Sequence, residues 1–74
     1  MTFGRLVKVT RQSRGWTQEE LAHRAFVSLR AVQSWEQQWR LPKLPTIPKV
    51  AKALRLPVHQ LSQLVTLSAY KRVV

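Results

Sequence analysis

Two helix-start signals lie eleven residues apart, and this short spacing restricts the chain more than any other feature. Thr17-Gln18-Glu19-Glu20 has the hydroxyl-x-x-Glu spacing of a capping box. In such a box Thr17 accepts a hydrogen bond from the backbone N–H of Glu20, and the Glu20 side chain reaches back to the backbone N–H of Thr17. Ser28 has the residue type of a second N-cap. The interval leaves room for about two turns of helix and a sharp corner. The stretch from Thr17 to Trp39 therefore predicts two short helices joined by a tight turn.

The second of these two helices is expected to be amphipathic. At helical spacing, Val32, Trp35 and Trp39 share one arc and predict the buried side. The opposite face carries Arg30, Gln33, Ser34 and Gln37. These side chains can donate hydrogen bonds and include no acid, which is the chemistry that reads base edges in a DNA major groove. Because any amphipathic helix has a polar face, this pattern alone leaves an ordinary solvated surface open.

The charge of the whole chain adds to this pattern. The 74 residues include thirteen Lys and Arg, three Glu and no Asp, which gives a net charge of +10. A compact domain with this charge repels itself, so we expect a polyanionic partner whose binding releases counterions. The basic residues are spread along the sequence, which argues against a disordered basic tail. Composition alone fits either nucleic acid or an anionic membrane surface.

The residues that catalysis and metal binding require are scarce. The chain has no Cys and no Asp, and its two His and three Glu lack the spacing of a nucleophile–base pair or a metal site. We therefore predict no catalytic residue, no metal and no cofactor. No apolar run approaches the roughly 18–20 residues of a membrane span, and no signal-peptide segment is apparent, so we expect a soluble cytoplasmic protein. Caps and prolines also argue against one long amphipathic membrane-surface helix.

Further helices are expected on both sides of the central stretch. The first spans roughly Phe3 to Arg14 and ends at Gly15, because Gly after a last-turn Arg is a usual helix end. The basic loop from Arg40 to Pro45 contains two prolines and cannot continue a helix. A fourth helix follows, with Thr46 as its predicted N-cap. Pro48 is tolerable in the first turn of that helix.

The end of the chain is divided between a last short helix and a tail. Pro57 starts the helix, and its apolar positions are Val58, Leu61, Leu64 and Val65. Residues 66–74 fit no helix well, and two interpretations stay open: a frayed tail, which we favour, or a short strand added at a dimer interface. A chain of this length allows one domain. The sequence thus predicts a compact all-α domain of five helices over residues 1–65 and a tail over residues 66–74.

The order of these segments resembles a known family. Gly15-Trp16-Thr17-Gln18-Glu19-Glu20-Leu21-Ala22 is followed by Ser28, Val32, Trp35 and Glu36, and then by Ile47-Pro48-Lys49-Val50-Ala51-Lys52-Ala53-Leu54. Over roughly residues 5–64 this pattern is similar to the Cro/C1-type (Xre family) helix-turn-helix domain of phage repressors and bacterial transcription regulators. The resemblance implies a five-helix, lambda repressor-like fold, in which the second helix crosses the DNA backbone and the third enters the major groove.

The resemblance also assigns roles to positions in this sequence. Gln18 matches a residue that bonds a DNA phosphate and braces the third helix, with help from Thr17. Arg30 is the main candidate for sequence reading, because a guanidinium can bond O6 and N7 of guanine together. Arg40 and Lys43, in the loop after the third helix, are candidates for neutralising phosphates. The expected DNA-binding residues are Thr17, Gln18, Ser28, Leu29, Arg30, Gln33, Ser34, Arg40 and Lys43.

Arg11 and Glu36 match a family pair that forms a partly buried ion pair between the first and third helices. Glu36 sits beside the predicted apolar arc and is one of only three acids in the chain, which supports the match. A solvated Glu36 is the alternative. If the pair is buried, removing one partner leaves the other charge without compensation.

Three positions depart from the family pattern. Phe26 stands at the corner between the second and third helices, where the family usually has Gly. Because a Phe at positive φ is strained, a rearranged corner is expected. Gln37-Gln38 replaces the Asn-Gly that usually follows the third helix, which favours a helix longer by up to a turn. Arg55 stands where a Gly often ends the fourth helix.

Residues and resemblance together predict a sequence-specific regulator of transcription that binds double-stranded DNA. We expect a repressor that binds a palindromic operator as a homodimer, with neither a membrane nor a small-molecule ligand as partner. In dimers of the family, the region of the fourth and fifth helices contacts the second copy. The resemblance therefore implies a dimer interface formed by Val58, Gln60 and Leu61 or by the tail. The alternative is an adaptor on the same fold, such as an antitoxin or a coactivator-like protein-interaction or RNA-binding module.

Overall fold

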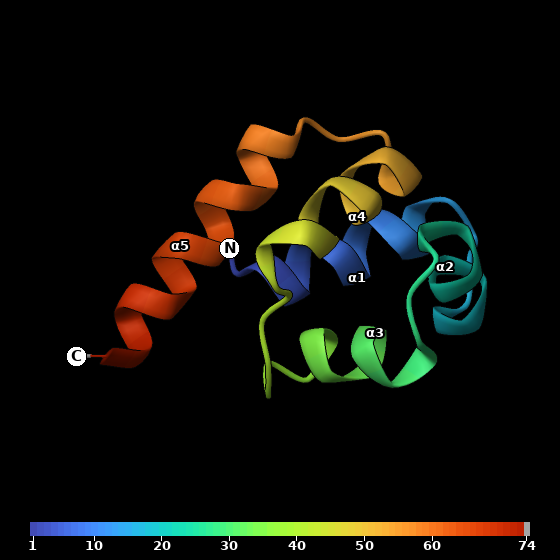
Figure 1. Cartoon of the computed structure of the whole chain (residues 1–74). Helices are drawn as coiled ribbons and strands as arrows, with labels where there is room; N and C mark the ends of the chain where they lie inside the picture. Colours follow the sequence, from blue (N-terminus) through green and yellow to red (C-terminus); the bar gives the residue numbers. More distant parts are fainter. Residues whose placement is uncertain (74) are drawn as a thin grey trace.

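The fold is described from a computed structural model, which describes the backbone of residues 1–73 and the side chains of residues 1–68. This backbone is helical and contains no strand, as predicted (Figure 1). Its elements are α1 (Phe3–Ser13), α2 (Gln18–Ala25), α3 (Leu29–Glu36), the 3-10 turn η1 (Leu44–Thr46), α4 (Ile47–Leu54) and α5 (Val58–Val73). The fully buried side chains of Leu21, Val32, Val50 and Leu61 show that α2, α3, α4 and α5 all contribute to one core.

α1 lies directly against α3, and Gly4 makes this approach possible. A Cβ atom at Gly4 would overlap the backbone carbonyl of Trp35, so a larger residue cannot occupy this position without a shift. Beside it, the rings of Phe3 and Trp35 meet edge to face with centroids 5.7 Å apart. At the other end, α1 stops at Ser13 and is followed by Gly15 with φ +73°, as its sequence predicts. α1 is thus a fixed support behind α3.

The residue at the corner between α2 and α3 has a left-handed backbone conformation, as Gly would in the family, although here it is Phe26. Its φ is 56° and its side chain is 84% exposed. The backbone N–H groups of Phe26 and Val27 donate to the carbonyls of His23 and Ala22 at 3.3 and 3.0 Å. These bonds satisfy the carbonyls at the end of α2 and hold the corner. The expected rearrangement of the corner is therefore wrong.

The end of α3 also differs from its prediction. α3 stops at Glu36, and Gln38 adopts a φ of 61°, so the expected extension through Gln37-Gln38 does not form. The N–H of Trp39 donates instead to the carbonyl of Ser34 at 2.9 Å, which closes the helix. This reversal turns Trp39 away from the core and leaves it 68% exposed. Its predicted place on the buried arc is wrong.

α4 begins after η1 rather than from a side-chain cap. Thr46 is at the N-cap position, as predicted, but its side chain makes no capping hydrogen bond, and Pro48 occupies the first turn. At the other end, Arg55 takes a φ of 56° where the family often has Gly. The N–H of Leu56 then donates to the carbonyl of Ala51 at 3.0 Å. In both α2 and α4, the residue that ends the helix in a left-handed backbone conformation is therefore not Gly: it is Phe26 in α2 and Arg55 in α4.

α5 is longer than the sequence suggests. The helix runs from Val58 to Val73, so the prediction that residues 66–74 form a non-helical tail is wrong for residues 66–73. No Gly or Pro follows Pro57, and each added residue gains one helical hydrogen bond once the helix has started on the core. Val74 lies outside the described residues. In Figure 1 the last turns of α5 extend away from the other helices.

Candidate nucleic-acid interface

α2 and α3 form the predicted helix–turn–helix, with each start fixed by its own cap. The hydroxyl of Thr17 accepts from the N–H of Glu20 at 3.1 Å, and the hydroxyl of Ser28 accepts from the N–H of Ala31 at 3.0 Å. Both N-cap predictions are confirmed. The carboxylate of Glu20 accepts instead from Nε of Arg24 at 2.9 Å, four residues along α2, so the predicted return bond of Glu20 to the Thr17 N–H is wrong.

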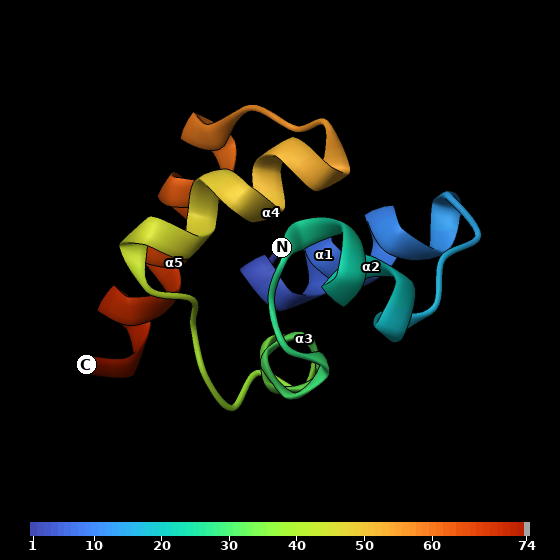
Figure 2. The ribbon, with the colours of Figure 1, turned by 45° about the vertical axis from the view of Figure 1, so that its right-hand side comes forward.

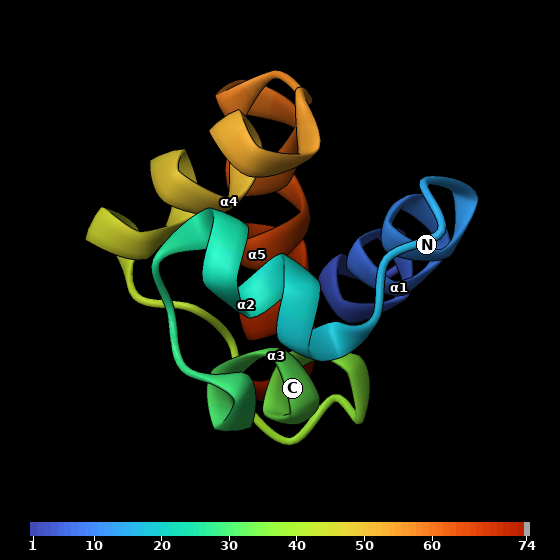
Figure 3. The ribbon, with the colours of Figure 1, turned by 90° about the vertical axis from the view of Figure 1, so that its right-hand side faces the viewer.

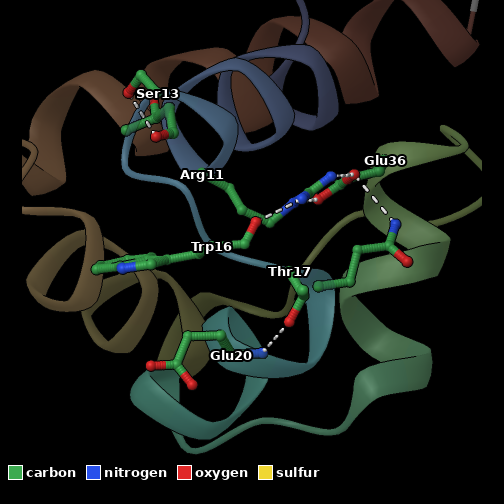
Figure 4. Close-up of polar contacts among 8 residues, drawn as sticks. Arg11, Ser13, Trp16, Thr17, Glu20 and Glu36 are labelled. Carbon is green, nitrogen blue, oxygen red and sulfur yellow. Dashed lines mark hydrogen bonds and ion pairs between the residues drawn. The ribbon is translucent and has the colours of Figure 1, made fainter.

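The ion pair between Arg11 and Glu36 joins α1 to the last turn of α3 (Figure 4). Nε and Nη2 of Arg11 donate to the two carboxylate oxygens of Glu36 at 2.8 and 2.9 Å. The two side chains are only 10% and 4% exposed, so the predicted partly buried pair is confirmed. Nη1 of Arg11 donates to the carbonyl of Trp16 at 2.8 Å. The hydrogen bonds to Glu36, opposed by burial, raise the pKa of Arg11 and keep the guanidinium charged.

Gln18 joins the same carboxylate from the first turn of α2. Its Nε2 donates to Oε1 of Glu36 at 3.1 Å. One acidic side chain therefore ties α1, α2 and α3 together, and the predicted bracing of α3 by Gln18 is confirmed. A phosphate contact of Gln18 stays a prediction.

The outward side of α3 forms one edge of the molecule. In Figures 1, 2 and 3, α3 lies at the lower edge with no helix beneath it. Arg30 is exposed there, while Gln33 and Ser34 are half-buried. These side chains border a hollow of about 590 Å³ between α3, the loop that follows it and the start of α4, which we call the α3 hollow. Six predicted DNA-binding residues line it: Ser28, Arg30, Gln33, Ser34, Arg40 and Lys43.

The α3 hollow is basic. Arg30, Arg40, Lys43 and Lys49 line it, and all four are exposed. Its lining, taken from the described part of the chain, includes no Asp or Glu. The hollow therefore combines a local positive charge with the hydrogen-bonding side chains of α3, which suits a polyanion with polar edges to read.

Comparison with known proteins identifies the arrangement. The family model described as helix-turn-helix matches residues 7–61, which include α2, α3 and the α3 hollow. The chain belongs to the Cro/C1-type (Xre) helix-turn-helix family. No curated protein matches it. As a member of this DNA-binding regulatory family, the chain is a DNA-binding helix-turn-helix regulator.

The helix-turn-helix places three predicted residues outside the α3 hollow. Thr17 and Gln18 stand at the start of α2, and Leu29 is half-buried in the first turn of α3. None of the three is among the residues that line the hollow. Any contact they make with DNA would lie beside the hollow, and their DNA-binding roles stay predictions.

The α3 hollow also contains residues that the sequence did not assign to DNA, among them the exposed Phe26, Trp39 and Lys49. Lys49 lies in the first turn of α4, whereas Phe26 precedes α3 in the chain and Trp39 follows it. Lys49 falls between the buried Ile47 and Val50, so a helical wheel could have placed it on the surface. Only the packing of α4 against α2 and α5 shows which surface it joins.

The prediction that Leu61 belongs to the dimer interface is wrong. Leu61 is fully buried in the core of this helix-turn-helix domain, where it packs α5 against the other helices together with Leu64 and Val65, so its side chain is not available to a second copy. Val58 is 44% exposed and Gln60 is exposed. These two remain from the predicted dimer contact.

Among the described residues, neither a cluster of metal ligands nor a membrane-spanning helix is present. No group of three or more His, Cys, Asp or Glu side chains within them is arranged to hold a metal ion. None of the helices in these residues has the length and apolar composition of a membrane span.

Proposed function

We propose that this chain regulates transcription by reading the sequence of double-stranded DNA with α3, and that it acts as a repressor bound to a palindromic operator as a homodimer. The observation that carries the proposal is the α3 hollow, where hydrogen-bonding side chains and four cations meet in a domain of a DNA-binding family. As a regulator related to those of phage and bacteria, it would work in the cytoplasm, where their DNA is found.

Base reading is assigned to the outward side of α3. Arg30 is exposed near the start of α3, in position to reach a base edge once the helix lies in the major groove. A guanidinium bonded to O6 and N7 of guanine discriminates against other bases by about 1–3 kcal/mol. Ser34 lies one turn further along the same helix, where its hydroxyl can donate or accept. Leu29 can offer apolar contact to a thymine methyl group.

Phosphate contacts are assigned to the surroundings of α3. Arg40 and Lys43 follow α3 in the loop, and Lys49 adds a third cation from α4. Thr17 and Gln18 stand at the N-terminus of α2, where backbone N–H groups favour an anion. These contacts would fix how the domain sits on the duplex without reading its sequence.

The homodimer follows from the size of the reading surface. α3 has eight residues, about 12 Å of helix, which reach only a few base pairs. Two copies would read half-sites about 34 Å apart along the DNA. Exposed Val58 and Gln60, together with residues 66–73 of α5, are the surface we assign to the contact between copies.

Selection from a pool of random duplexes tests this proposal. We expect enrichment of a palindrome whose half-sites are separated by one helical turn, with a footprint that overlaps a promoter in the source genome. No enriched sequence, together with retained binding to a protein or to single-stranded RNA, would favour the adaptor alternative. An enriched site without symmetry would keep DNA reading and refute the dimer.

A further inference from the structure

The two exposed aromatic side chains of the described residues line the same hollow. Phe26 is 84% and Trp39 is 68% exposed, and both line the α3 hollow. By contrast, Phe3 is fully buried, Trp35 is 4% exposed and Trp16 packs against the core. Single exposed apolar residues are ordinary, but two large rings in one basic hollow are not explained by chance exposure.

Backbone geometry presents both rings to solvent. Phe26 itself has a φ of 56°, and Trp39 directly follows Gln38 with a φ of 61°. A left-handed residue with a bulky side chain is strained, and Gly would serve the same corner without strain. The exposed ring of Phe26 adds little packing to the fold, so neither local conformation nor the core accounts for it. A residue that is strained and exposed at once points to contact with something outside the chain.

The charged side chains around Phe26 and Trp39 restrict the chemistry of the partner that can contact these rings. Arg40, Lys43 and Lys49 line the same hollow, and its lining contains no carboxylate. An apolar protein partner would leave these cations without counter-charges when it covered the rings. A sugar–phosphate backbone alternates charged phosphates with deoxyribose rings that have apolar faces.

We propose that the part of the α3 hollow formed by Phe26, Trp39 and three cations holds one strand of the DNA backbone, with the two rings packed on deoxyribose rings and Arg40, Lys43 and Lys49 on the phosphates between them. This leaves Arg30 and Ser34 on α3 for the bases. This inference rests on the proposed binding of double-stranded DNA. It adds two non-ionic contacts, one from a residue before the start of α3 and one from a residue after its end, which clamp the recognition helix to the duplex. These contacts contribute affinity but read no base.

The non-ionic character of the clamp gives it a distinct signature. Removing a cation releases one fewer counterion, so it lowers the slope of log K against log salt by about one. Removing a ring changes no charge, so affinity falls by the same factor at every salt concentration and the slope is unchanged. The salt series therefore separates a ring that touches the backbone from one that only perturbs a neighbouring cation.

Duplex binding of the full chain is measured from about 50 to 200 mM salt with a random duplex of about 20 base pairs. The variants are W39A, F26G and K43A, because Gly suits the φ of Phe26 and Trp39 is exposed. Leu44→Ala is the matched control, since Leu44 is 77% exposed beside the α3 hollow but does not line it. We expect W39A and F26G each to weaken binding about tenfold at every salt, and L44A to bind like the wild type.

Quenching of tryptophan fluorescence by acrylamide gives a second readout. Trp39 is much more exposed than Trp35, so the difference between wild type and W39F reports mainly on Trp39. The clamp predicts that saturating duplex shields this signal from acrylamide, while the melting temperature of W39A matches that of the wild type.

The outcomes are distinguishable. Wild-type affinity of W39A and F26G, with weakened binding by K43A, overturns the clamp and leaves the proposed function standing. Losses seen on single-stranded DNA but not on duplex overturn the clamp in favour of base stacking. If the wild type binds no duplex at all, the proposed function fails and the clamp fails with it.

Discussion

The inward and outward sides of α3 use charge in opposite ways. On the inward side, the carboxylate of Glu36 is surrounded by donors from Arg11 and Gln18 and is almost inaccessible to water. On the outward side, Arg30 and Lys43 stand in solvent, and no acid lines the same hollow. Charges of the first kind fix the helix in place, and charges of the second kind are available to a partner. Substitutions on the two sides should therefore damage different properties.

The largest expected effect is on the inward side, at Glu36→Ala. This change leaves the Arg11 guanidinium buried without its counter-charge, which costs about 3–5 kcal/mol of unfolding free energy. Glu19→Ala is the matched control, because Glu19 is exposed on α2. Thermal unfolding monitored by circular dichroism checks the difference. Equal melting temperatures for the two variants would mean that the inward pair does not hold α3.

Gly4→Ala tests the contact of α1 with the same side of α3. The added Cβ overlaps the carbonyl of Trp35, so α1 must move away, at a cost of roughly 3 kcal/mol. Gly15→Ala is a useful comparison because a Cβ there meets nothing within 4 Å and suffers only from its positive φ, at about 1 kcal/mol. Chemical denaturation gives both values. A smaller loss for Gly4→Ala than for Gly15→Ala would refute the close approach.

Lys43→Ala belongs to the outward side and should leave stability unchanged. It removes one phosphate contact, so we expect weaker binding to every duplex and a salt slope reduced by about one. Lys8→Ala, an exposed cation on α1, is the control for loss of net charge alone. Fluorescence anisotropy over a salt series checks this. Identical slopes for the two variants would show that the α3 hollow does not hold the phosphates.

The smallest expected effect is the change in stability caused by Phe26→Gly, at a residue that we also assign to DNA binding. Phe26→Gly should raise stability by about 0.5 kcal/mol, because relief of left-handed strain exceeds the added entropy of the unfolded chain. Arg55→Gly, also at φ 56°, should gain a similar amount and leave DNA binding unchanged. Denaturant melts and binding titrations on both variants check this pair. A loss of stability at both positions would contradict the strain.

Local chemistry made part of this structure readable from the sequence. Thr17 and Ser28 cap helices through bonds between residues three apart, so neighbouring residues determine them. The pairing of Arg11 with Glu36 spans twenty-five positions and came from the family pattern rather than from spacing. Family resemblance therefore supplied the long-range contact that local rules do not contain.

Most of the misses around α3 have one physical cause in common: tertiary packing outweighed a local preference. Phe26 and Gln38 adopt left-handed conformations that their residue types disfavour. The chain must turn at Phe26 to bring α3 onto α1 and α2, and at Gln38 to leave α3 for the loop that leads to α4. Trp39 follows the turn at Gln38 and becomes exposed although its spacing fits the buried arc. Lys49 reaches the α3 hollow through the packing of α4, which no local pattern reports.

The central claim is that the outward side of α3 reads base sequence, and Arg30→Ala tests it most directly. Affinity for the selected duplex and for a scrambled duplex of equal length should be measured at one salt concentration for the wild type and the variant. The account predicts that the wild type prefers the selected duplex by about a thousandfold or more, and that Arg30→Ala reduces this preference roughly ten- to a hundredfold. Equal losses on both duplexes, with the preference intact, would contradict it.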